Sequence, residues 1–202
     1  FISTVTWIFF RYASRSDRSQ SRKPGLWGIR VDNISLNYAI TQVQHWINKG
    51  SDHCMIVTPD ALAALRSRTD ERYRRIVKNA ALVLPDGAGL IAALKLLHTP
   101  IQERIPGVEF TEHICKRASY EGWGIWFLGG SPGIAEIAAK KLAEKYPGLK
   151  ISGTRNGYFT NEETENICME IRESNAKILF VGLGVPRQEY WLEENLAKSG
   201  AT

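Results

Sequence analysis

A carboxylate follows an apolar run at the point where a strand of an α/β sheet would present it for chemistry. Residues 81–87 read Ala-Leu-Val-Leu-Pro-Asp-Gly, so the apolar run stops at a proline and delivers Asp86. Ligands of open α/β sheets bind outside the carboxyl ends of the strands, which makes Asp86 a candidate catalytic group. Because Pro-Asp-Gly also favours a turn on its own account, a purely structural role for these residues stays open.

Three further apolar runs end in the same manner, in polar or glycine-rich turns. If all four runs are strands of one parallel sheet, their ends meet at one edge, and we expect them to build a single cleft. The three runs and their turns are 55–57 with Thr58-Pro59-Asp60, 125–128 with 129–133, and 178–181 with 182–189.

Two of these turns carry groups that can bind phosphate or sugar. Gly129 and Gly130 lead into a helix, whose free backbone N–H groups and dipole can hold a phosphate. Glycines at that point equally serve a tight turn with close packing of helix on sheet. The other turn contains Gly184 and ends in Arg187 and Gln188, whose side chains can bind sugar hydroxyls, a base edge or phosphate.

The segment 87–92 fits the pattern Gly-x-Gly-x-x-Ala between a strand and a helix, which is one mark of dinucleotide binding. Against this, Asp86 stands directly before the segment and would repel a pyrophosphate. An acidic residue is also expected about 20 positions further on, at the end of a second strand. Glu103 and Glu109 fall in a loop and at a helix start instead. A nucleotide-binding oxidoreductase is therefore an alternative rather than the main hypothesis.

The sequence offers no pattern of metal ligands. His45, His53, His98 and His113 lack ligand spacing, and the chain contains no Asp-x-Asp. Transferases that handle nucleotide diphosphates commonly chelate a divalent cation with such an acidic pair. We therefore expect no metal and no cofactor, and we expect arginine or helix dipoles to neutralise a leaving diphosphate.

Charge and cysteine content narrow the class of protein further. The chain of 202 residues has a formal net charge of +5, but residues 1–23 hold five basic residues and one acidic residue, which leaves 24–202 nearly neutral. A nucleic-acid partner is therefore not expected. Cys54, Cys115 and Cys168 are odd in number and widely spaced, as in a cytosolic protein with reduced, buried thiols. No apolar stretch reaches the ~20 residues of a membrane-spanning helix.

The chain divides into a short N-terminal segment and one domain. Residues 1–24 combine an apolar stretch with a Ser/Arg-rich run, which we interpret as a disordered or upstream linker remnant, with a tail that touches anionic lipid as the alternative. From residue 25, strand and helix patterns alternate, which predicts a Rossmann-like α/β domain over 25–202, a parallel sheet flanked by helices on both faces. The expected strands are 27–31, 54–57, 81–84, 124–128, 149–153 and 177–182, and the expected helices are 36–49, 60–67, 69–79, 88–97, 109–120, 132–145, 161–173 and 187–198.

Taken together, these motifs resemble the WecG/TagA/CpsF family of bacterial glycosyltransferases. The resemblance covers residues 26–198, in order and with matching intervals, and the combined pattern is far more specific than any one of its parts. It rests on Thr58-Pro59, Leu84-Pro85-Asp86-Gly87, Arg104 with Gly107, Gly129-Gly130, Gly157-Tyr158-Phe159 and the segment 182–191.

The resemblance implies an inverting glycosyl transfer that needs no metal. Family members move N-acetylmannosamine or its uronic acid from a UDP donor to a polyprenyl-diphosphate-linked acceptor, as peripheral proteins at the cytoplasmic face of the cell membrane. By position in the motifs, Asp86 is the general base and Thr58 lines the same pocket. Arg104 is expected to stabilise diphosphate charge, and Gln188 to position sugar or nucleotide. The remaining substrate-binding candidates are Gly129, Gly130, Gly184 and Asp60.

The sequence departs from the family pattern at Asp60, where asparagine is usual, and at Glu109, where aspartate is usual. Asp60 adds negative charge beside a diphosphate donor unless its side chain points away. Relatives continue past the last helix into a strand and a basic appendage that reaches the membrane. We therefore expect the domain to be C-terminally truncated, to bind UDP weakly and to transfer little sugar. A non-catalytic nucleotide-binding remnant is the second alternative.

Overall fold

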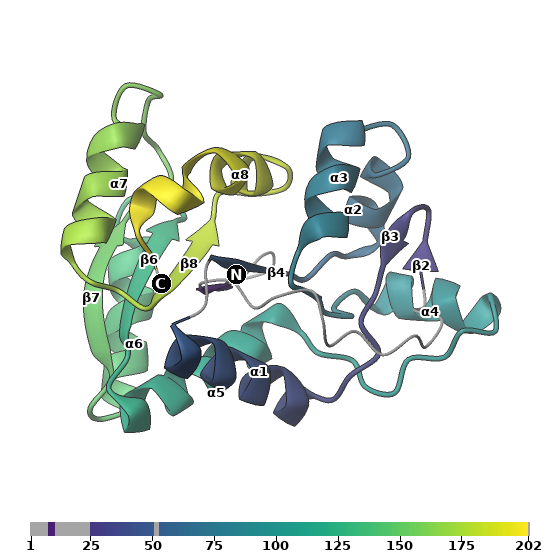
Figure 1. Ribbon diagram of the computed structural model, residues 1–202, viewed down its shortest axis with the longest axis horizontal. Helices are drawn as coiled ribbons and strands as arrows, with labels where there is room; N and C mark the ends of the chain where they lie inside the picture. Colours follow the sequence, from purple (N-terminus) through teal and green to yellow (C-terminus); the bar gives the residue numbers. More distant parts are fainter. Residues whose placement is uncertain (1–7, 11–24, 51–52, 202) are drawn as a thin grey trace.

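Strands form the middle layer of the molecule, and helices cover this layer on two sides (Figure 1). The computed structural model describes residues 8–10, 25–50 and 53–201. The strands are β1 (Ile8–Phe10), β2 (Gly25–Leu26), β3 (Ile29–Arg30), β4 (Cys54–Val57), β5 (Leu82–Val83), β6 (Gly124–Gly129), β7 (Lys150–Arg155) and β8 (Ile178–Gly182). The helices are α1 (Leu36–Lys49), α2 (Ala61–Arg66), α3 (Glu71–Asn79), α4 (Ala88–Leu96), α5 (Gly107–Glu121), α6 (Ile134–Lys145), α7 (Thr164–Glu173) and α8 (Arg187–Ser199).

Two three-stranded sheets and one hairpin make up the strand layer. The first sheet has the order β1-β4-β5 and the second the order β7-β6-β8, while β2 and β3 form the hairpin. β4 runs parallel to β5, and β6 runs parallel to both β7 and β8, whereas β1 pairs antiparallel with β4. Strand β1 belongs to the predicted linker segment 1–24, the rest of which lies outside the described residues.

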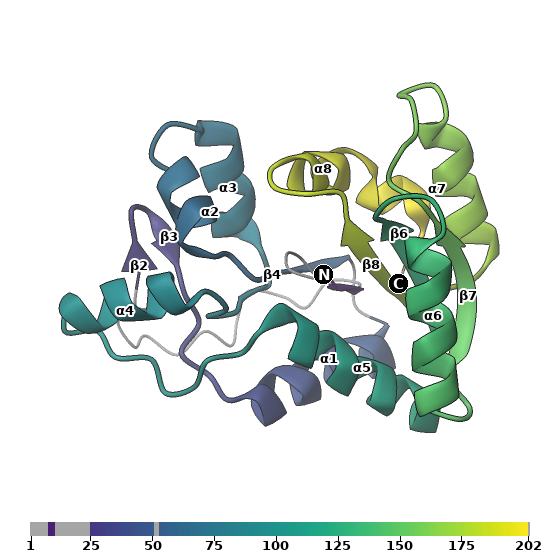
Figure 2. The ribbon, with the colours of Figure 1, turned by 180° about the vertical axis from the view of Figure 1, so that it is seen from behind.

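The two sheets share two hydrophobic cores, one on each face. Successive side chains of a strand point to opposite faces. Along β6, Trp126 and Leu128 enter the first core, whereas Ile125 and Phe127 enter the second. Helices α2, α3, α4, α7 and α8 cover the first core, and α1, α5 and α6 cover the second (Figures 1 and 2). The predicted α/β fold with parallel strands and helices on both faces is confirmed.

Capping residues set the starts of the helices that lead away from the strands. Ser35, Asp60 and Asp70 each accept a hydrogen bond from a backbone N–H in the first turn of α1, α2 and α3. Such caps satisfy donors that the first turn of a helix leaves unpaired. The predicted helix over 36–49, with Ser35 as its cap, is confirmed. None of the described helices is long and apolar enough to cross a membrane.

The first predicted strand is wrong in detail. We expected one strand over 27–31, but β2 and β3 pair as an antiparallel hairpin that turns at Trp27 and Gly28. Both turn residues have a positive φ, 51° for Trp27 and 85° for Gly28. Glycine adopts this conformation readily and tryptophan rarely. The sequence pattern was misleading because a tryptophan next to a leucine normally extends a strand.

The three cysteines are buried and form no disulfide among the described residues, as predicted. Cys54 lies in β4, Cys115 in α5 and Cys168 in α7. Burial raises the pKa of the Cys115 thiol to about 12, so this side chain is protonated at neutral pH.

Candidate active site

Asp86 and Thr58 lie together where β5 and β4 end. The parallel pairing of β4 with β5 brings the two side chains to one edge of the sheet. Both face Gly107 at the start of α5. A Cβ on Gly107 would lie 3.0 Å from Thr58 Oγ1 and 3.5 Å from Asp86 Oδ2. The Gly107 N–H also donates to Asp86 Oδ2 at 3.2 Å, so this glycine both holds the carboxylate and leaves room for the hydroxyl.

Arg104 reaches back over the turn that contains Asp86. Its Nε donates to the Asp86 backbone oxygen at 2.5 Å, and its Nη2 lies 3.6 Å from Asp86 Oδ1. The loop is held in place because the N–H of the buried Ile105 donates to Pro85 O at 2.9 Å. The Arg104 side chain is 52% exposed, so the guanidinium can meet an anion that arrives from solvent.

Asp86 has an altered acidity. Burial raises the pKa of its carboxyl above the ordinary value, and the charge of Asp60 adds to the increase. The hydrogen bond from Gly107 and the positive charge of Arg104 oppose this increase. A carboxylate with a raised pKa holds a transferred proton more tightly, which suits a general base.

Asp60 is directed toward its own helix. Its Oδ1 accepts a hydrogen bond from the Ala63 N–H at 2.8 Å and so caps α2. Aspartate and asparagine are about equally good caps, because either side-chain oxygen can accept this bond. The structure thus shows how the chain accommodates aspartate at a position where asparagine was expected.

The glycine turns after β6 and β8 pack directly against each other. A Cβ on Gly129 would lie 2.3 Å from Gly182 O, and the Gly130 N–H donates to the same carbonyl at 3.1 Å. Gly157, which follows β7, donates its N–H to Gly130 O at 2.8 Å. A Cβ on Gly130 would also lie 3.0 Å from Ile134 Cγ2 of α6, so the turn packs closely against both the neighbouring strand and the helix, and phosphate binding stays a prediction.

Gln188 and Glu189 occupy the first turn of α8 and have exposed fractions of 0%. Gly184 leads into this turn, because its carbonyl accepts the Gln188 N–H at 3.0 Å. The Gln188 side-chain Nε2 donates to Glu189 Oε1 at 3.3 Å. The proposed contact of Gln188 with sugar or nucleotide stays a prediction.

Several buried polar atoms have no hydrogen-bond partner among the described residues. Buried polar groups are normally bonded to protein, water or ligand, so such atoms are candidates for recognising a substrate. The sequence reasoning missed the aromatic members of this set, because an aromatic residue at helical or strand spacing usually indicates core. The atoms near the carboxyl ends of the strands and on the first core are Thr58 Oγ1, Trp126 Nε1, Gln188 Oε1 and Trp191 Nε1.

Helix α8 is tied to α3 by charged contacts. Arg72 contacts Glu193 at 2.8 Å and Glu194 at 2.6 Å. Its guanidinium also lies 4.3 Å from the centre of the Tyr190 ring, whose hydroxyl donates to Asp70. These contacts link the helix that follows β8 to the helices that follow β4.

The predicted site residues fall into two groups. Helices α2 and α3, which follow β4, and α8, which follows β8, stand on the same side of the strands in both views (Figures 1 and 2). That both groups line one cleft stays a prediction. The first group is Thr58, Asp60, Asp86 and Arg104, and the second is Gly129, Gly130, Gly184 and Gln188.

The glycines that suggested dinucleotide binding have a structural role. A Cβ on Gly87 would lie 2.8 Å from Asp60 Cα, and one on Gly89 would lie 3.1 Å from Ala61 Cβ. Both glycines therefore let α2 and α4 approach each other closely.

We expect Glu189 to give the fold a specific pH dependence. Burial raises the pKa of its carboxyl to about 7 from an ordinary value of 4.5. Between these values the folded state binds more protons than the unfolded state, so the free energy of unfolding falls as pH rises. We would measure the free energy of unfolding with urea at about pH 5 and at about pH 8. Between these pH values, the free energy of unfolding of the unmodified chain should fall by up to about 3 kcal/mol more than that of Glu189→Gln.

Glu193 on the same helix is a matched control of opposite sign. Although burial opposes the effect, hydrogen bonds from Arg72 and Arg75 lower the pKa of Glu193. Its contribution to stability is therefore lost as pH falls through the acidic range. Glu193→Gln should still show the fall in the free energy of unfolding above about pH 5 that Glu189 causes. Identical pH dependence of the unmodified chain and Glu189→Gln would contradict the role given to Glu189.

Parallel strands with a carboxylate and a hydroxyl at their carboxyl ends are typical of α/β enzymes, whose ligands bind at this edge of the sheet. The chain belongs to the glycosyl transferase WecG/TagA/CpsF family, which it matches over residues 25–202, and it is a glycosyltransferase. The family predicted from the motifs is confirmed, and the oxidoreductase alternative is wrong.

Similar proteins include the N-acetylglucosaminyldiphosphoundecaprenol N-acetyl-beta-D-mannosaminyltransferases of three Staphylococcus aureus strains, NCTC 8325 / PS 47, COL and MRSA252. Each is 26% identical to this chain over 177 residues. The matched part is 87% of this chain and 69% of each relative.

Proposed function

We propose that the enzyme transfers an N-acetylmannosamine-type sugar from a UDP donor to N-acetylglucosamine on a polyprenyl diphosphate, in the synthesis of teichoic acid or another surface polysaccharide. The name of the relatives describes this transfer onto N-acetylglucosaminyldiphosphoundecaprenol. The observation that carries the proposal is the Asp86 carboxylate beside the Thr58 hydroxyl, with Arg104 over the same turn. A base for the acceptor and a cation for the diphosphate are what such a transfer requires.

In the proposed mechanism, Asp86 is the general base. Its carboxylate takes the proton of an acceptor hydroxyl while that oxygen bonds to the anomeric carbon of the donor. The bond from this carbon to the diphosphate oxygen breaks on the opposite face, and UDP leaves with the electron pair. An α-linked donor then yields a β-linked product, in agreement with the word "beta" in the relatives' name.

Thr58 and Arg104 are proposed to hold the substrates during this step. Thr58 Oγ1 is buried and has no hydrogen-bond partner among the described residues, so it can bond a substrate hydroxyl or phosphate oxygen. Arg104 already faces Asp86 and offers a planar fork of donors that matches phosphate oxygens. Because the charge on the diphosphate grows as it departs, Arg104 should act mainly on the transition state.

The direct test supplies UDP-N-acetylmannosamine and a short-chain prenyl diphosphate bearing N-acetylglucosamine. Mass spectrometry detects the disaccharide product, and the one-bond carbon–hydrogen coupling constant at its anomeric carbon distinguishes an α from a β linkage. A β-linked disaccharide supports the proposal, whereas an α-linked product would rule out inversion. Binding of UDP in calorimetry without transfer from any UDP-N-acetylhexosamine would favour a non-catalytic nucleotide-binding remnant.

Transfer should not depend on a divalent metal. We expect equal initial rates with excess EDTA and with added Mg²⁺ or Mn²⁺. Arg104→Gln should lower turnover by about 10²–10³-fold, because a preorganised charge beside the leaving group is lost. Arg104→Lys should recover only part of this loss, because a lysine lacks the planar fork. Loss of transfer in EDTA, restored by metal, would contradict this part of the proposal.

The lipid-linked acceptor implies that the enzyme works at the inner surface of the cell membrane. We propose a cytoplasmic, peripheral location there, because both the soluble donor and the lipid diphosphate must reach one site.

A further inference from the structure

Exposed apolar side chains gather at one corner of the molecule, formed by α2, α4 and the β2–β3 hairpin. These elements touch one another: α4 contacts both α2 and β2, and Ser67 at the end of α2 donates to Trp27 O at 2.9 Å. All four exposed leucines of the described residues lie here. The exposed fractions are 75% for Leu62, 46% for Leu65, 81% for Leu96, 55% for Leu97 and 44% for Trp27, and we call these five residues the apolar corner.

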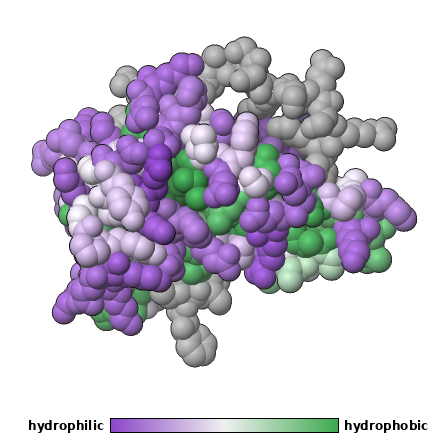
Figure 3. Space-filling view, turned by 90° about the horizontal axis from the view of Figure 1, so that it is seen from below, coloured by the Kyte–Doolittle hydropathy of each residue, from purple (hydrophilic) through white to green (hydrophobic). Residues whose placement is uncertain are grey.

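Figure 3 shows apolar surface at the right-hand end of the molecule, where Figure 1 places α4 and the hairpin, and further apolar surface in the middle of this face. The other exposed large apolar residues of the described chain are spread over α1, α5, α6, α7 and the loop after β7. A soluble protein rarely gathers such side chains in one place unless they meet a partner or a membrane.

Basic side chains surround the apolar corner. Arg74 packs against Gly28 of the hairpin, and Lys78 lines the pocket beside it, whereas Arg72 and Arg75 point to α8 and pair with Glu193. The guanidinium carbon of Arg68 lies 5.7 Å from the centre of the Trp27 ring, so the exposed aromatic ring makes a cation–π contact with a basic side chain. Lys95 is exposed on α4 immediately before Leu96.

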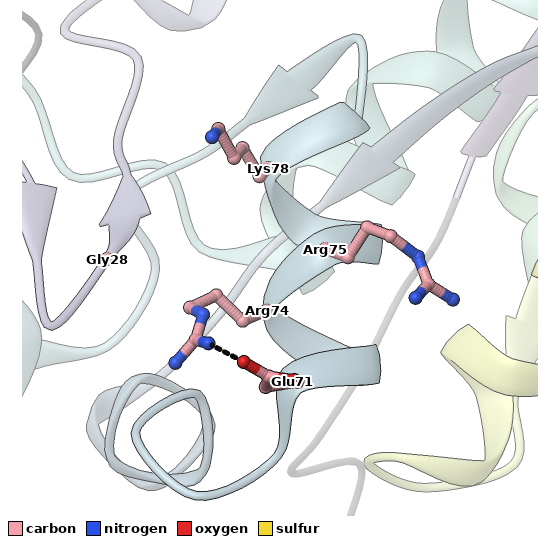
Figure 4. A pocket seen from close by; sticks show the side chains of 5 residues that line it. All are labelled: Gly28, Glu71, Arg74, Arg75 and Lys78. Atoms are coloured by element: carbon pink, nitrogen blue, oxygen red, sulfur yellow. Dashed lines mark hydrogen bonds and ion pairs between the residues drawn. The ribbon is translucent and has the colours of Figure 1, made fainter.

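A basic pocket of about 450 Å³ adjoins the apolar corner. It lies between the hairpin and α3, next to Trp27, and it is distinct from the site around Asp86. Figure 4 shows that Arg74 reaches toward the hairpin and pairs with Glu71, whereas Arg75 extends away from the hairpin. The lining residues are Gly28, Glu71, Arg74, Arg75 and Lys78.

We propose that the apolar corner and its basic rim form a membrane-docking surface that seats the enzyme on an anionic bilayer. Leucine and tryptophan side chains enter the boundary between headgroups and acyl chains, while lysine and arginine bind the lipid phosphates. The positive charge around the apolar corner favours an anionic bilayer over a second copy of the chain, because a symmetric dimer would bring the same basic side chains face to face.

The position of the surface fits the chemistry proposed above. Helix α2 starts directly after Asp60, and α4 starts directly after Gly87, so both begin beside the candidate base. With six residues, α2 is only about 9 Å long, which places Leu62 within one turn of the site. A lipid diphosphate at headgroup level would then reach Asp86 without leaving the interface. This functional meaning rests on the proposed acceptor, whereas the docking itself does not.

Vesicle flotation tests the docking without donor or acceptor, so its result is independent of whether sugar is transferred. The full chain should float with vesicles of equal parts phosphatidylcholine and phosphatidylglycerol and much less with phosphatidylcholine alone. The double variant Leu62→Glu/Leu96→Glu should reduce binding to the anionic vesicles by roughly tenfold or more, because two apolar side chains no longer enter the interface. Matched controls are Tyr120→Glu and Ile137→Glu, exposed apolar residues of α5 and α6 that should bind as the unmodified chain does.

Vesicles with brominated acyl chains locate the contact directly. Bromine quenches tryptophans that enter the membrane, and Trp27→Phe should remove most of the quenchable fluorescence. Unchanged flotation of the double variant, equal losses in the controls, or unchanged quenching in Trp27→Phe would each overturn the proposal. Sedimentation without lipid identifies the competing occupant: a dimer that Leu62→Glu/Leu96→Glu dissociates would show that a second copy covers the corner instead.

Discussion

Asp86→Asn, tested in a chain extended to the length of its relatives, should keep the fold and lose turnover by about 10²–10⁴-fold, because asparagine fills the same space but cannot accept the acceptor's proton. The Gly107 N–H can still donate to the amide oxygen, so the local structure should be retained. Initial rates with saturating donor and acceptor measure the effect, and thermal unfolding checks the fold.

Two comparisons make this result specific to the base. Glu144→Gln removes an exposed carboxylate of α6, far from the site, and should leave the rate unchanged. UDP affinity of Asp86→Asn should stay within the same order of magnitude, because the base acts on the acceptor rather than on the nucleotide. Near-normal transfer by Asp86→Asn would exclude Asp86 as the base while leaving the family assignment untouched.

Gly129→Ala should be among the most destabilising single substitutions in the chain. Gly129 has a φ of +139°, and a Cβ there would lie 2.3 Å from Gly182 O and 2.5 Å from Gly182 C. Because these are backbone atoms of a paired strand, no side-chain movement can relieve the clash. We expect a loss of more than about 4 kcal/mol in the free energy of unfolding, measured with urea, or failure to fold.

Gly133→Ala separates this clash from the cost of the backbone conformation alone. Gly133 has a φ of +83°, but a Cβ there would meet nothing within 4 Å. The variant should therefore lose only about 1–2 kcal/mol, the usual penalty for a left-handed residue with a side chain. Equal losses in Gly129→Ala and Gly133→Ala would show that strain, and not the contact with Gly182, explains both.

The local features of the fold were accessible from the sequence because they depend on neighbouring residues. Ser35 before an amphipathic run predicted the start of α1, and the apolar runs ending in Thr58 and Asp86 predicted two strand ends at one edge. The rule that chemistry gathers at carboxyl ends of parallel strands then placed both side chains together.

Features that depend on distant contacts could not be predicted in this way. The complete burial of Glu189 arises from the packing of α8 over the first core. The neighbouring residues in the first turn of α8 give no signal of this burial. Tyr73 lies in α3, a helix rich in arginine, yet its side chain is fully buried. Its spacing with Ile76 and Val77 is the signal that would have revealed the buried face.

The three buried thiols offer a way to follow the native protein as it fluctuates. A disulfide reagent reacts with a thiolate that it can reach, so each cysteine should react only when its surroundings open. Cys54, Cys115 and Cys168 lie in a strand and two helices that belong to different parts of the two cores. The order in which they are labelled therefore reports which part of the molecule opens first, and Cys54 does so for the strand that ends at Thr58.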